Sequence, residues 1–263
     1  MAMDFMRRII LACLTLAIAS ICLYSCLIRD VDTSSALPKS RFIAYYQTSN
    51  RHHVALRVVI ALFHRVYPWV ELYLYVDSDT TDNIVSRLNE QVRIKFITDK
   101  QARGASRSPL HFDTVHAAEA YIQRLQATAS LMPRGWVFLL EDDVWAIQAV
   151  EEKDLRYDIS GTCWAIYRPE YSTIVWNQTG RCYGGYGGHF INSSRLLGLS
   201  DSRIRTLITD LLAVYSPIAS DELLSAVILQ DGGTIGYYTG YYERLVGEGP
   251  FKTQHQMKLF YNW

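Results

Sequence analysis

The fold is best predicted from one stretch of the chain, Trp136-Val-Phe-Leu-Leu140, which runs directly into Glu141-Asp142-Asp143. Five apolar residues in a row are typical of a strand that is buried on both faces of a parallel sheet. The three carboxylates at its end repel one another and resist the loss of hydration, so we expect something to offset their charge. A divalent cation would do this, since Mg²⁺ and Mn²⁺ prefer carboxylate oxygens. The alternative is a solvated turn after a strand.

Strand and helix patterns alternate on the amino-terminal side of this stretch. We expect strands at residues 41–46, 71–76 and 92–97, and helices at residues 52–66, 80–90 and 113–131. This alternation predicts an α/β fold with a mostly parallel sheet and flanking helices. Acids at the carboxyl end of such a strand lie where open α/β sheets bind ligands.

The carboxyl-terminal side of the chain is less regular. We expect a strand within residues 158–166, helices at about 202–214 and 220–230, and a short strand near 234–238. A glycine-rich segment, Tyr183-Gly-Gly-Tyr-Gly-Gly188, lies between these elements.

Residues 9–28 carry no charge and are predominantly apolar. A helix of about 20 residues spans roughly 30 Å, the hydrocarbon thickness of a bilayer. Because Arg7 and Arg8 precede the run, the positive-inside rule places residues 1–8 in the cytosol and the rest of the chain across the membrane. Residues 29–40 are polar and predict a short stem. We expect an uncleaved transmembrane anchor; a cleaved signal peptide is the alternative.

Composition and charge narrow the class of partner. The chain has 263 residues, of which 49% are apolar, and its 26 basic and 26 acidic residues cancel. Nucleic-acid-binding proteins normally have a basic face, so we expect no nucleic-acid partner. The 18 tyrosines suit a carbohydrate or nucleotide site, because a phenol ring stacks while its hydroxyl forms hydrogen bonds; ordinary core and surface composition would also account for them.

Four features follow one another along the chain: Glu141-Asp142-Asp143, the loop 183–188, Ser220-Asp221-Glu222 at the start of a helix, and His255 in the tail. With the anchor and the α/β first half, their order resembles the GT-A class of nucleotide-sugar glycosyltransferases, in particular the type II membrane enzymes. The resemblance covers about residues 41–258. It implies a GT-A (Rossmann-like) catalytic domain at 41–263, with a nucleotide-binding half (41–145) and a half for donor sugar and acceptor (146–263).

In this class the acid motif binds Mn²⁺ or Mg²⁺, and the metal bridges the diphosphate of the sugar donor. The resemblance implies that Asp143 is a direct metal ligand and that Asp142 or Glu141 binds the metal through water or holds the ribose. The sequence Glu-Asp-Asp departs from the strict Asp-x-Asp (DXD) pattern, which leaves the division of roles among the acids open. His255 resembles the carboxy-terminal histidine that completes the metal ligands in many GT-A enzymes, and imidazole is a suitable Mn²⁺ ligand.

The glycines of the loop are Gly184, Gly185, Gly187 and Gly188. Glycine lets the backbone approach a ligand closely. The resemblance places such a loop at the donor-sugar and acceptor site; a tight turn between two strands is the alternative.

Asp221 and Glu222 match the position of an acid that opens a helix in the class. In inverting enzymes that acid is the general base, which removes the proton of the acceptor hydroxyl. Asp221 is the preferred candidate. The alternative is structural, because Ser220-Asp221-Glu222 is also an ordinary helix-capping sequence.

By position in the class, the nucleotide would lie near the ends of the first two strands, at Tyr45, Tyr46, Gln47, Asp77 and Asp79. Arg107, in a basic loop, and Lys252, in the tail, would face the phosphates. For Arg107 a solvated loop position is the alternative.

We therefore expect a metal-dependent glycosyltransferase that moves a sugar from a nucleotide-diphosphate donor, a UDP-sugar in the first instance, to a hydroxyl of a glycan or glycoprotein. Inversion is favoured because a candidate base exists. The catalytic domain would be luminal, in the Golgi or endoplasmic reticulum by default. The alternatives are a metal-dependent phosphotransferase or nucleotidyltransferase, and a non-catalytic glycan-binding domain.

Overall fold

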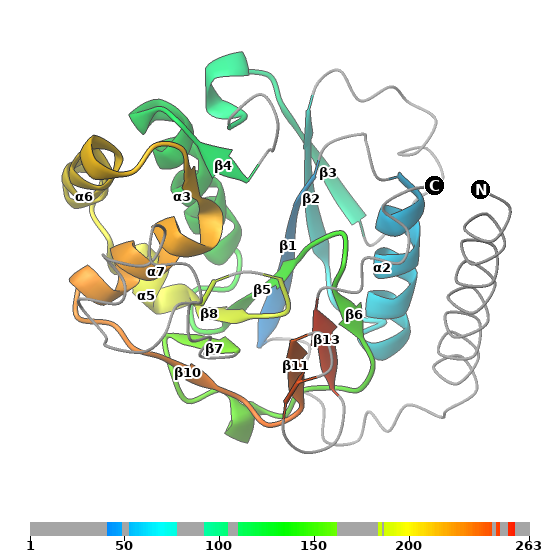
Figure 1. Ribbon diagram of the computed structural model, residues 1–263. Coiled ribbons are helices and arrows are strands. Elements are labelled where there is room, and N and C mark those ends of the chain that lie inside the picture. The colour runs from blue at the N-terminus through cyan, green and yellow to red at the C-terminus, as the bar shows by residue number, and fades with distance from the viewer. Residues whose placement is uncertain are drawn as a thin grey trace, which may run out of the picture.

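The computed structural model describes residues 41–48, 53–77, 92–104, 110–161, 184–185, 187–243, 246–247 and 252–255. Its centre is a seven-stranded sheet in the order β10-β7-β8-β5-β1-β2-β3 (Figure 1). The strands are β1 (Phe42–Thr48), β2 (Leu72–Asp77), β3 (Val92–Ile97), β5 (Trp136–Leu140), β7 (Ile159–Gly161), β8 (Phe190–Asn192) and β10 (Ile235–Tyr237). Only β8 runs antiparallel to its neighbours, β5 and β7, among the described strands of this sheet. The predicted, mostly parallel α/β sheet is confirmed.

Helices cover both faces of the sheet (Figure 1). One face carries α2 (His53–Val66), and the other carries α3 (Val115–Ala129), α5 (Ser193–Gly198), α6 (Asp201–Val214) and α7 (Ser220–Gln230). Two short 3₁₀ turns, η3 (Lys100–Ala102) and η4 (Glu152–Asp154), lie in the connections.

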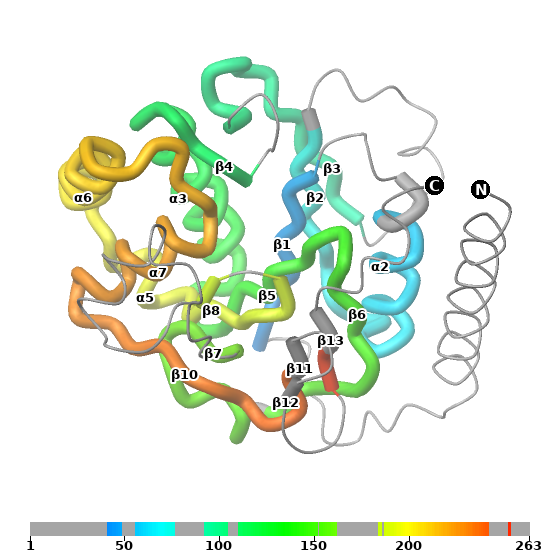
Figure 2. The backbone as a smooth tube through the Cα atoms, in the orientation of Figure 1, coloured from blue at the N-terminus to red at the C-terminus, as the bar shows by residue number. Residues whose placement is uncertain are grey.

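Two small sheets complete the fold. The first has the order β12-β11-β13-β6, and Figure 2 shows β11 and β13 close to β6 although they lie far apart in sequence. Its strands are β6 (Trp145–Ala146), β11 (Tyr241–Glu243), β12 (Val246–Gly247) and β13 (Thr253–His255). The second pairs β4 (His111–Phe112) with β9 (Ile218–Ala219).

The side chains of the central strands alternate between two buried clusters. Tyr46 and Phe138 pack in the cluster on the α2 side, whereas Tyr45 and Val137 pack in the cluster beneath α3, α6 and α7. A strand that is covered on both faces needs apolar residues at every position, which explains the continuous apolar runs in the sequence. Each large apolar side chain buried in this way contributes about 1.5–3 kcal/mol.

The element boundaries follow local chemistry. The helix predicted at 113–131 begins later because Thr114 is its N-cap, and the Thr114 side chain accepts a hydrogen bond from the Ala117 N–H. The helix predicted at 80–90 and all but the first few residues of the strand predicted within 158–166 lie outside the described residues.

Across the described ranges, no helix is long and apolar enough to cross a bilayer. The predicted tail, anchor and stem (1–8, 9–28 and 29–40) lie outside those ranges.

Candidate active site

The three acids form a turn, the acid turn (141–143), at the carboxyl end of β5. The Val144 N–H donates to the Glu141 carbonyl at 3.2 Å and closes the turn before β6 begins. Because β5 pairs in parallel with β1, the acids lie next to the carboxyl end of β1. Asp143 is 4% exposed, and Glu141 and Asp142 are half-buried.

Residues of β1 hold Asp142 in place. The Tyr46 hydroxyl donates to Asp142 Oδ1, and the Thr48 hydroxyl donates to the same oxygen at 3.1 Å. The sequence placed Tyr46 against a nucleotide. In the structure the Tyr46 ring is buried in the core, and its hydroxyl positions an acid of the turn.

Tyr45 and Gln47 lie on the other face of β1, and both are buried. Gln47 Oε1 accepts from the Tyr45 hydroxyl at 2.7 Å and from Arg124 Nε and Nη2 at 3.2 and 3.1 Å. The guanidinium carries only donors, so the amide oxygen of Gln47 must face it. Burial raises the pKa of Tyr45, and Arg124 opposes this shift. The Tyr45 hydroxyl is thus used inside the protein rather than on a ligand face.

The first two described glycines of the loop pack on α7. The Gly184 N–H donates to Ser225 Oγ at 2.8 Å, and the Ser225 hydroxyl donates back to the Gly184 carbonyl at 2.5 Å. The Gly185 N–H donates to His189 Nδ1 at 2.8 Å. A side chain at position 185 would meet Leu224. The φ of Gly185, +89°, is also one that glycine adopts without strain.

The next two glycines lie between the acid turn and β13. A Cβ on Gly187 would stand 2.4 Å from Val144 Cγ2 and 2.9 Å from Glu141 Cβ. A Cβ on Gly188, whose φ is +86°, would stand 2.8 Å from side-chain atoms of both Thr253 and Tyr241. The glycine segment therefore contacts the acid turn, α7 and the small sheet at once, and no larger residue fits without a shift.

The start of α7 differs from the simple cap that the sequence allowed. Its N-cap is Ala219, which makes no side-chain cap bond, and Ser220 is already helical. Glu222 accepts from the Ala219 N–H, which is the acidic half of a capping box. Burial raises the pKa of Glu222 to about 8; the charge of Asp221 adds to the shift and the Ala219 N–H opposes it. Asp221 is half-buried.

Tyr121 of α3 connects the acid turn to α7. Burial raises the pKa of Tyr121 well above its ordinary value; Tyr45, Glu141 and Asp221 raise it further, and a hydrogen bond with Ser220 opposes them. Glu141 of the acid turn and Asp221 of α7 therefore both lie near enough to the buried Tyr121 hydroxyl to raise its pKa. The acid turn, the glycine segment and the start of α7 thus share neighbours, although residues 141–143 and 220–222 lie far apart in sequence.

His111 of β4 also faces this region, and the sequence did not single it out. Its strand pairs with β9, which places His111 opposite Ala219, the N-cap of α7. Loss of hydration lowers the pKa of His111, and the nearby Glu141 carboxylate opposes that shift. This proximity depends on a pairing between residues 111 and 219, which no local pattern reveals.

Two residues of the tail, Lys252 and His255, were singled out in the sequence. Lys252 Nζ lies 2.6 Å from Asp154 Oδ2 and 3.5 Å from Glu151 Oε1, so in this structure its ammonium group pairs with two carboxylates of the protein. His255 ends β13, where its backbone lies opposite Glu243 of β11. The side chains of His255 and of Asp77, which ends β2, and all of Asp79 and Arg107 lie outside the described residues.

The oxygen donors of the acid turn are of the type that Mn²⁺ and Mg²⁺ bind. Within the part of the chain that the structure describes, however, no group of three His, Cys, Asp or Glu side chains is arranged to hold a metal.

The chain has the fold of a galactosyltransferase. It superposes on galactosyltransferase LgtC, solved in complex with donor and acceptor sugar analogs, with a TM-score of 0.57, 10% identity, and coverage of 81% of this chain and 86% of LgtC. An active-site mutant of LgtC superposes equally well, with a TM-score of 0.56 and 10% identity over the same shares of the two chains. The predicted GT-A fold is therefore confirmed.

Core-mannan synthase A of Aspergillus fumigatus, solved in an Mn/GDP form, is a more distant match. Its TM-score is 0.49 at 8% identity, with coverage of 79% of this chain and 76% of that one. No protein-family model matches the chain, and no curated protein sequence does.

Proposed function

We propose that this protein is a metal-dependent glycosyltransferase that transfers a sugar from a nucleotide-diphosphate donor to a hydroxyl of a glycan or glycoprotein. One observation carries the proposal: the glycine segment packs on the acid turn through Gly187, on α7 through Gly184 and Gly185, and on β13 through Gly188. The acid turn, the start of α7 and the strand that carries His255 thereby meet at the glycine segment, on a fold shared with a galactosyltransferase.

Asp143 and Asp142 would hold the metal, with His255 as a third ligand. The metal, when bound, would offset the negative charge on the departing nucleoside diphosphate. The hydroxyls of Tyr46 and Thr48 would fix one carboxylate oxygen of Asp142 and so hold the Asp142 side chain in one orientation.

Asp221 would act as the general base. The acceptor oxygen attacks the anomeric carbon, the bond from that carbon to the phosphate oxygen breaks, and the acceptor proton passes to the Asp221 carboxylate. Attack opposite the leaving group inverts the anomeric centre. Glu222, which is 8% exposed and has a raised pKa, is the less accessible of the two acids.

We also propose that residues 9–28 anchor the protein as a type II membrane protein whose catalytic domain lies in the lumen of the Golgi or endoplasmic reticulum. The support is the uncharged run and the two arginines that precede it.

Thermal unfolding of the full chain with a panel of nucleotide sugars, with and without Mn²⁺, tests the function. A ligand that binds only the folded state stabilises it by about 2.7 kcal/mol at a hundredfold excess over its dissociation constant. We expect one nucleotide family to raise the melting temperature when Mn²⁺ is present. Asp143→Ala should abolish that metal-dependent rise and leave the protein folded. A folded wild type that responds to no donor would contradict the proposal.

A further inference from the structure

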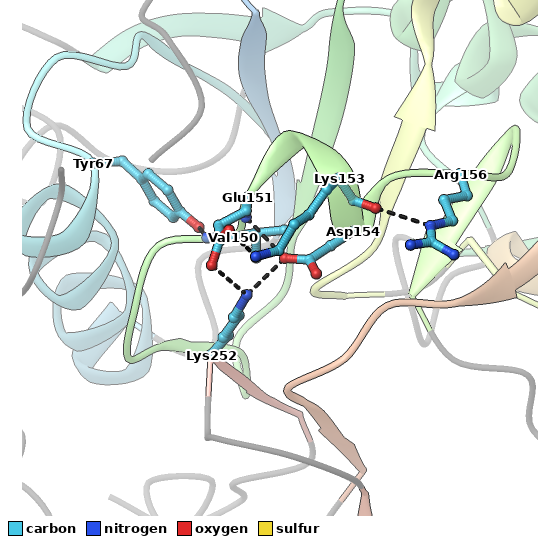
Figure 3. A network of polar contacts seen from close by, with 7 residues as sticks. All are labelled: Tyr67, Val150, Glu151, Lys153, Asp154, Arg156 and Lys252. Atoms are coloured by element: carbon cyan, nitrogen blue, oxygen red, sulfur yellow. Dashed lines mark hydrogen bonds and ion pairs between the residues drawn. The ribbon is translucent and has the colours of Figure 1, made fainter. Parts of the chain in front are cut away.

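The C-terminal strand β13 is tied to the segment that follows the acid turn by a buried network of charges (Figure 3). Lys252 is 7% exposed and Asp154 is 9% exposed, and their Nζ and Oδ2 atoms lie 2.6 Å apart. Lysine is almost never buried to this extent unless it is paired. Asp154 Oδ2 also accepts from the Glu151 N–H at 2.9 Å, so the carboxylate has a defined orientation.

The backbone at the same place continues this connection. The carbonyl of Lys252 accepts from the N–H groups of Ile147 and Gln148, at 2.9 and 3.1 Å. These two residues directly follow β6, which itself pairs with β13. The Val150 N–H donates to the buried Tyr67 hydroxyl at 2.8 Å, which fixes the other end of the segment to the core (Figure 3).

Burying two charged side chains costs free energy. A buried ion pair must repay the loss of hydration of both groups, and apolar residues of similar size often pack at lower cost. A buried pair does, however, specify a position, because neither charge tolerates the loss of its partner. Here the position concerns the site, since Thr253 of β13 packs against Gly188 and β6 starts two residues after Asp143.

We infer that Lys252 is a positioning residue whose ion pair with Asp154 locks β13 against the segment after the acid turn. The lock sets the place of the glycine segment and of His255 relative to Asp143. This inference rests on the proposed function for its effect on the donor, but the lock itself can be measured without any ligand. It differs from the expectation that Lys252 binds the diphosphate, because the Lys252 ammonium is already paired with two carboxylates of the protein.

Amide hydrogen exchange on the full chain tests the lock directly. Lys252→Met and Asp154→Asn should each speed exchange at the Ile147 and Gln148 amides by about tenfold or more, because each removes one charge of a buried pair. The control is Arg93→Met, which removes the exposed ion pair of Arg93 with Glu71 and should leave these two amides unchanged. If the Ile147 and Gln148 amides of Asp154→Asn exchange at the wild-type rate, the inference is overturned.

Donor affinity separates the lock from a phosphate contact. If Lys252 positions the strand, both single variants weaken binding of the best nucleotide sugar by a similar factor, and the exchange of charges, Lys252→Asp with Asp154→Lys, restores part of it. If Lys252 touches the diphosphate, Asp154→Asn retains donor binding, Lys252→Met loses it, and the double variant Lys252→Asp with Asp154→Lys does not regain it.

The two proposals fail in different ways. Should the wild type bind no nucleotide sugar, the proposed function fails while hydrogen exchange still decides the lock. If a single variant does not fold, the double variant Lys252→Asp with Asp154→Lys decides. Recovered folding with slow amide hydrogen exchange at Ile147 and Gln148 supports the lock, and a double variant that also fails to fold overturns it.

Discussion

Asp221 and Glu222 are neighbours in sequence with different surroundings, and the difference is testable at the level of single residues. Asp221 is half-buried, whereas Glu222 is buried and its pKa is raised to about 8 by burial and by the charge of Asp221. A pair of neighbouring carboxyls in which one has a strongly raised pKa is typical of sites that move protons.

Glu222 should make the protein less stable as the pH rises. Its pKa in the folded state, about 8, lies above the ordinary 4.5, so the unfolded chain loses its proton first. The stabilising contribution of the protonated form is complete below about pH 4.5 and is lost by about pH 8. Glu222→Gln should match the wild type at pH 4.5 and exceed its unfolding free energy by up to about 5 kcal/mol at pH 8.5.

Urea unfolding at the two pH values provides the measurement. Asp113→Asn, at an exposed acid, is the control and should follow the wild type. Equal stability of Glu222→Gln and wild type at both pH values would show that the pKa of Glu222 is not raised in the folded protein.

Asp221→Asn should separate binding from turnover. The amide keeps the shape of the side chain but cannot accept the proton of the acceptor hydroxyl, so kcat should fall by about 10²–10⁴-fold while donor affinity stays near that of the wild type. Steady-state kinetics and donor titration give the two quantities. Turnover close to wild type would move the base to Glu222 or indicate transfer without inversion.

At the scale of secondary-structure elements, the glycine segment is the connection that the rest of the site depends on. Gly187→Ala places a methyl group 2.4 Å from Val144 and 2.9 Å from Glu141, so the backbone or the acid turn must shift. We expect a loss of about 1–3 kcal/mol of stability, as for other overpacked sites, together with weaker donor binding.

Gly198 offers a matched control for this change. It ends α5, and a Cβ there would meet no atom within 4 Å. Gly198→Ala should be neutral or slightly stabilising, since alanine favours helix over glycine by up to about 1 kcal/mol. Thermal unfolding compares the two variants, and equal effects would show that the segment adapts without strain.

The sequence predicted individual elements well where a local pattern defines them. The strand at 136–140 and the helix at 220–230 agree with β5 and α7 because apolar runs and helical spacing depend on nearby residues alone. The roles of Tyr45 and Tyr46 were less predictable. Their strand was correct, but the partners of their hydroxyls, Gln47 and Asp142, depend on which face each ring occupies and on the pairing of β1 with β5.

Long-range pairing accounts for what the sequence could not reveal. His111 comes near the acid turn through β4 and β9, and Arg124 reaches Gln47 from α3, 77 residues further along the chain. The ion pair of Lys252 with Asp154 could not be predicted either, because nothing in the local sequence of the tail indicates that Asp154 lies beside it.

At the scale of the whole molecule, the parallel sheet explains why distant motifs meet. Strands that run in the same direction end at one edge, so the residues after β1 and β5 lie together, and the antiparallel β8 turns the chain back so that the glycine segment before it lies at the same edge. The small sheet then brings the tail to β6. The site is thus a product of topology, and we expect its parts to be lost together on unfolding.

The proposed anchor makes a prediction about the chain as a whole. Residues 9–28 are long enough to span a bilayer, and Arg7 and Arg8 should retain the amino terminus in the cytosol. In sealed microsomes the full chain should resist alkaline extraction, and added protease should leave residues 41–263 intact until detergent opens the vesicles. Leu14→Arg with Leu16→Arg is the control, because each arginine near the helix centre costs about 2.5–3.5 kcal/mol on insertion. A wild-type chain that alkaline washing releases, or one that has lost its amino terminus by cleavage within residues 9–28, would replace the anchor with a cleaved signal peptide.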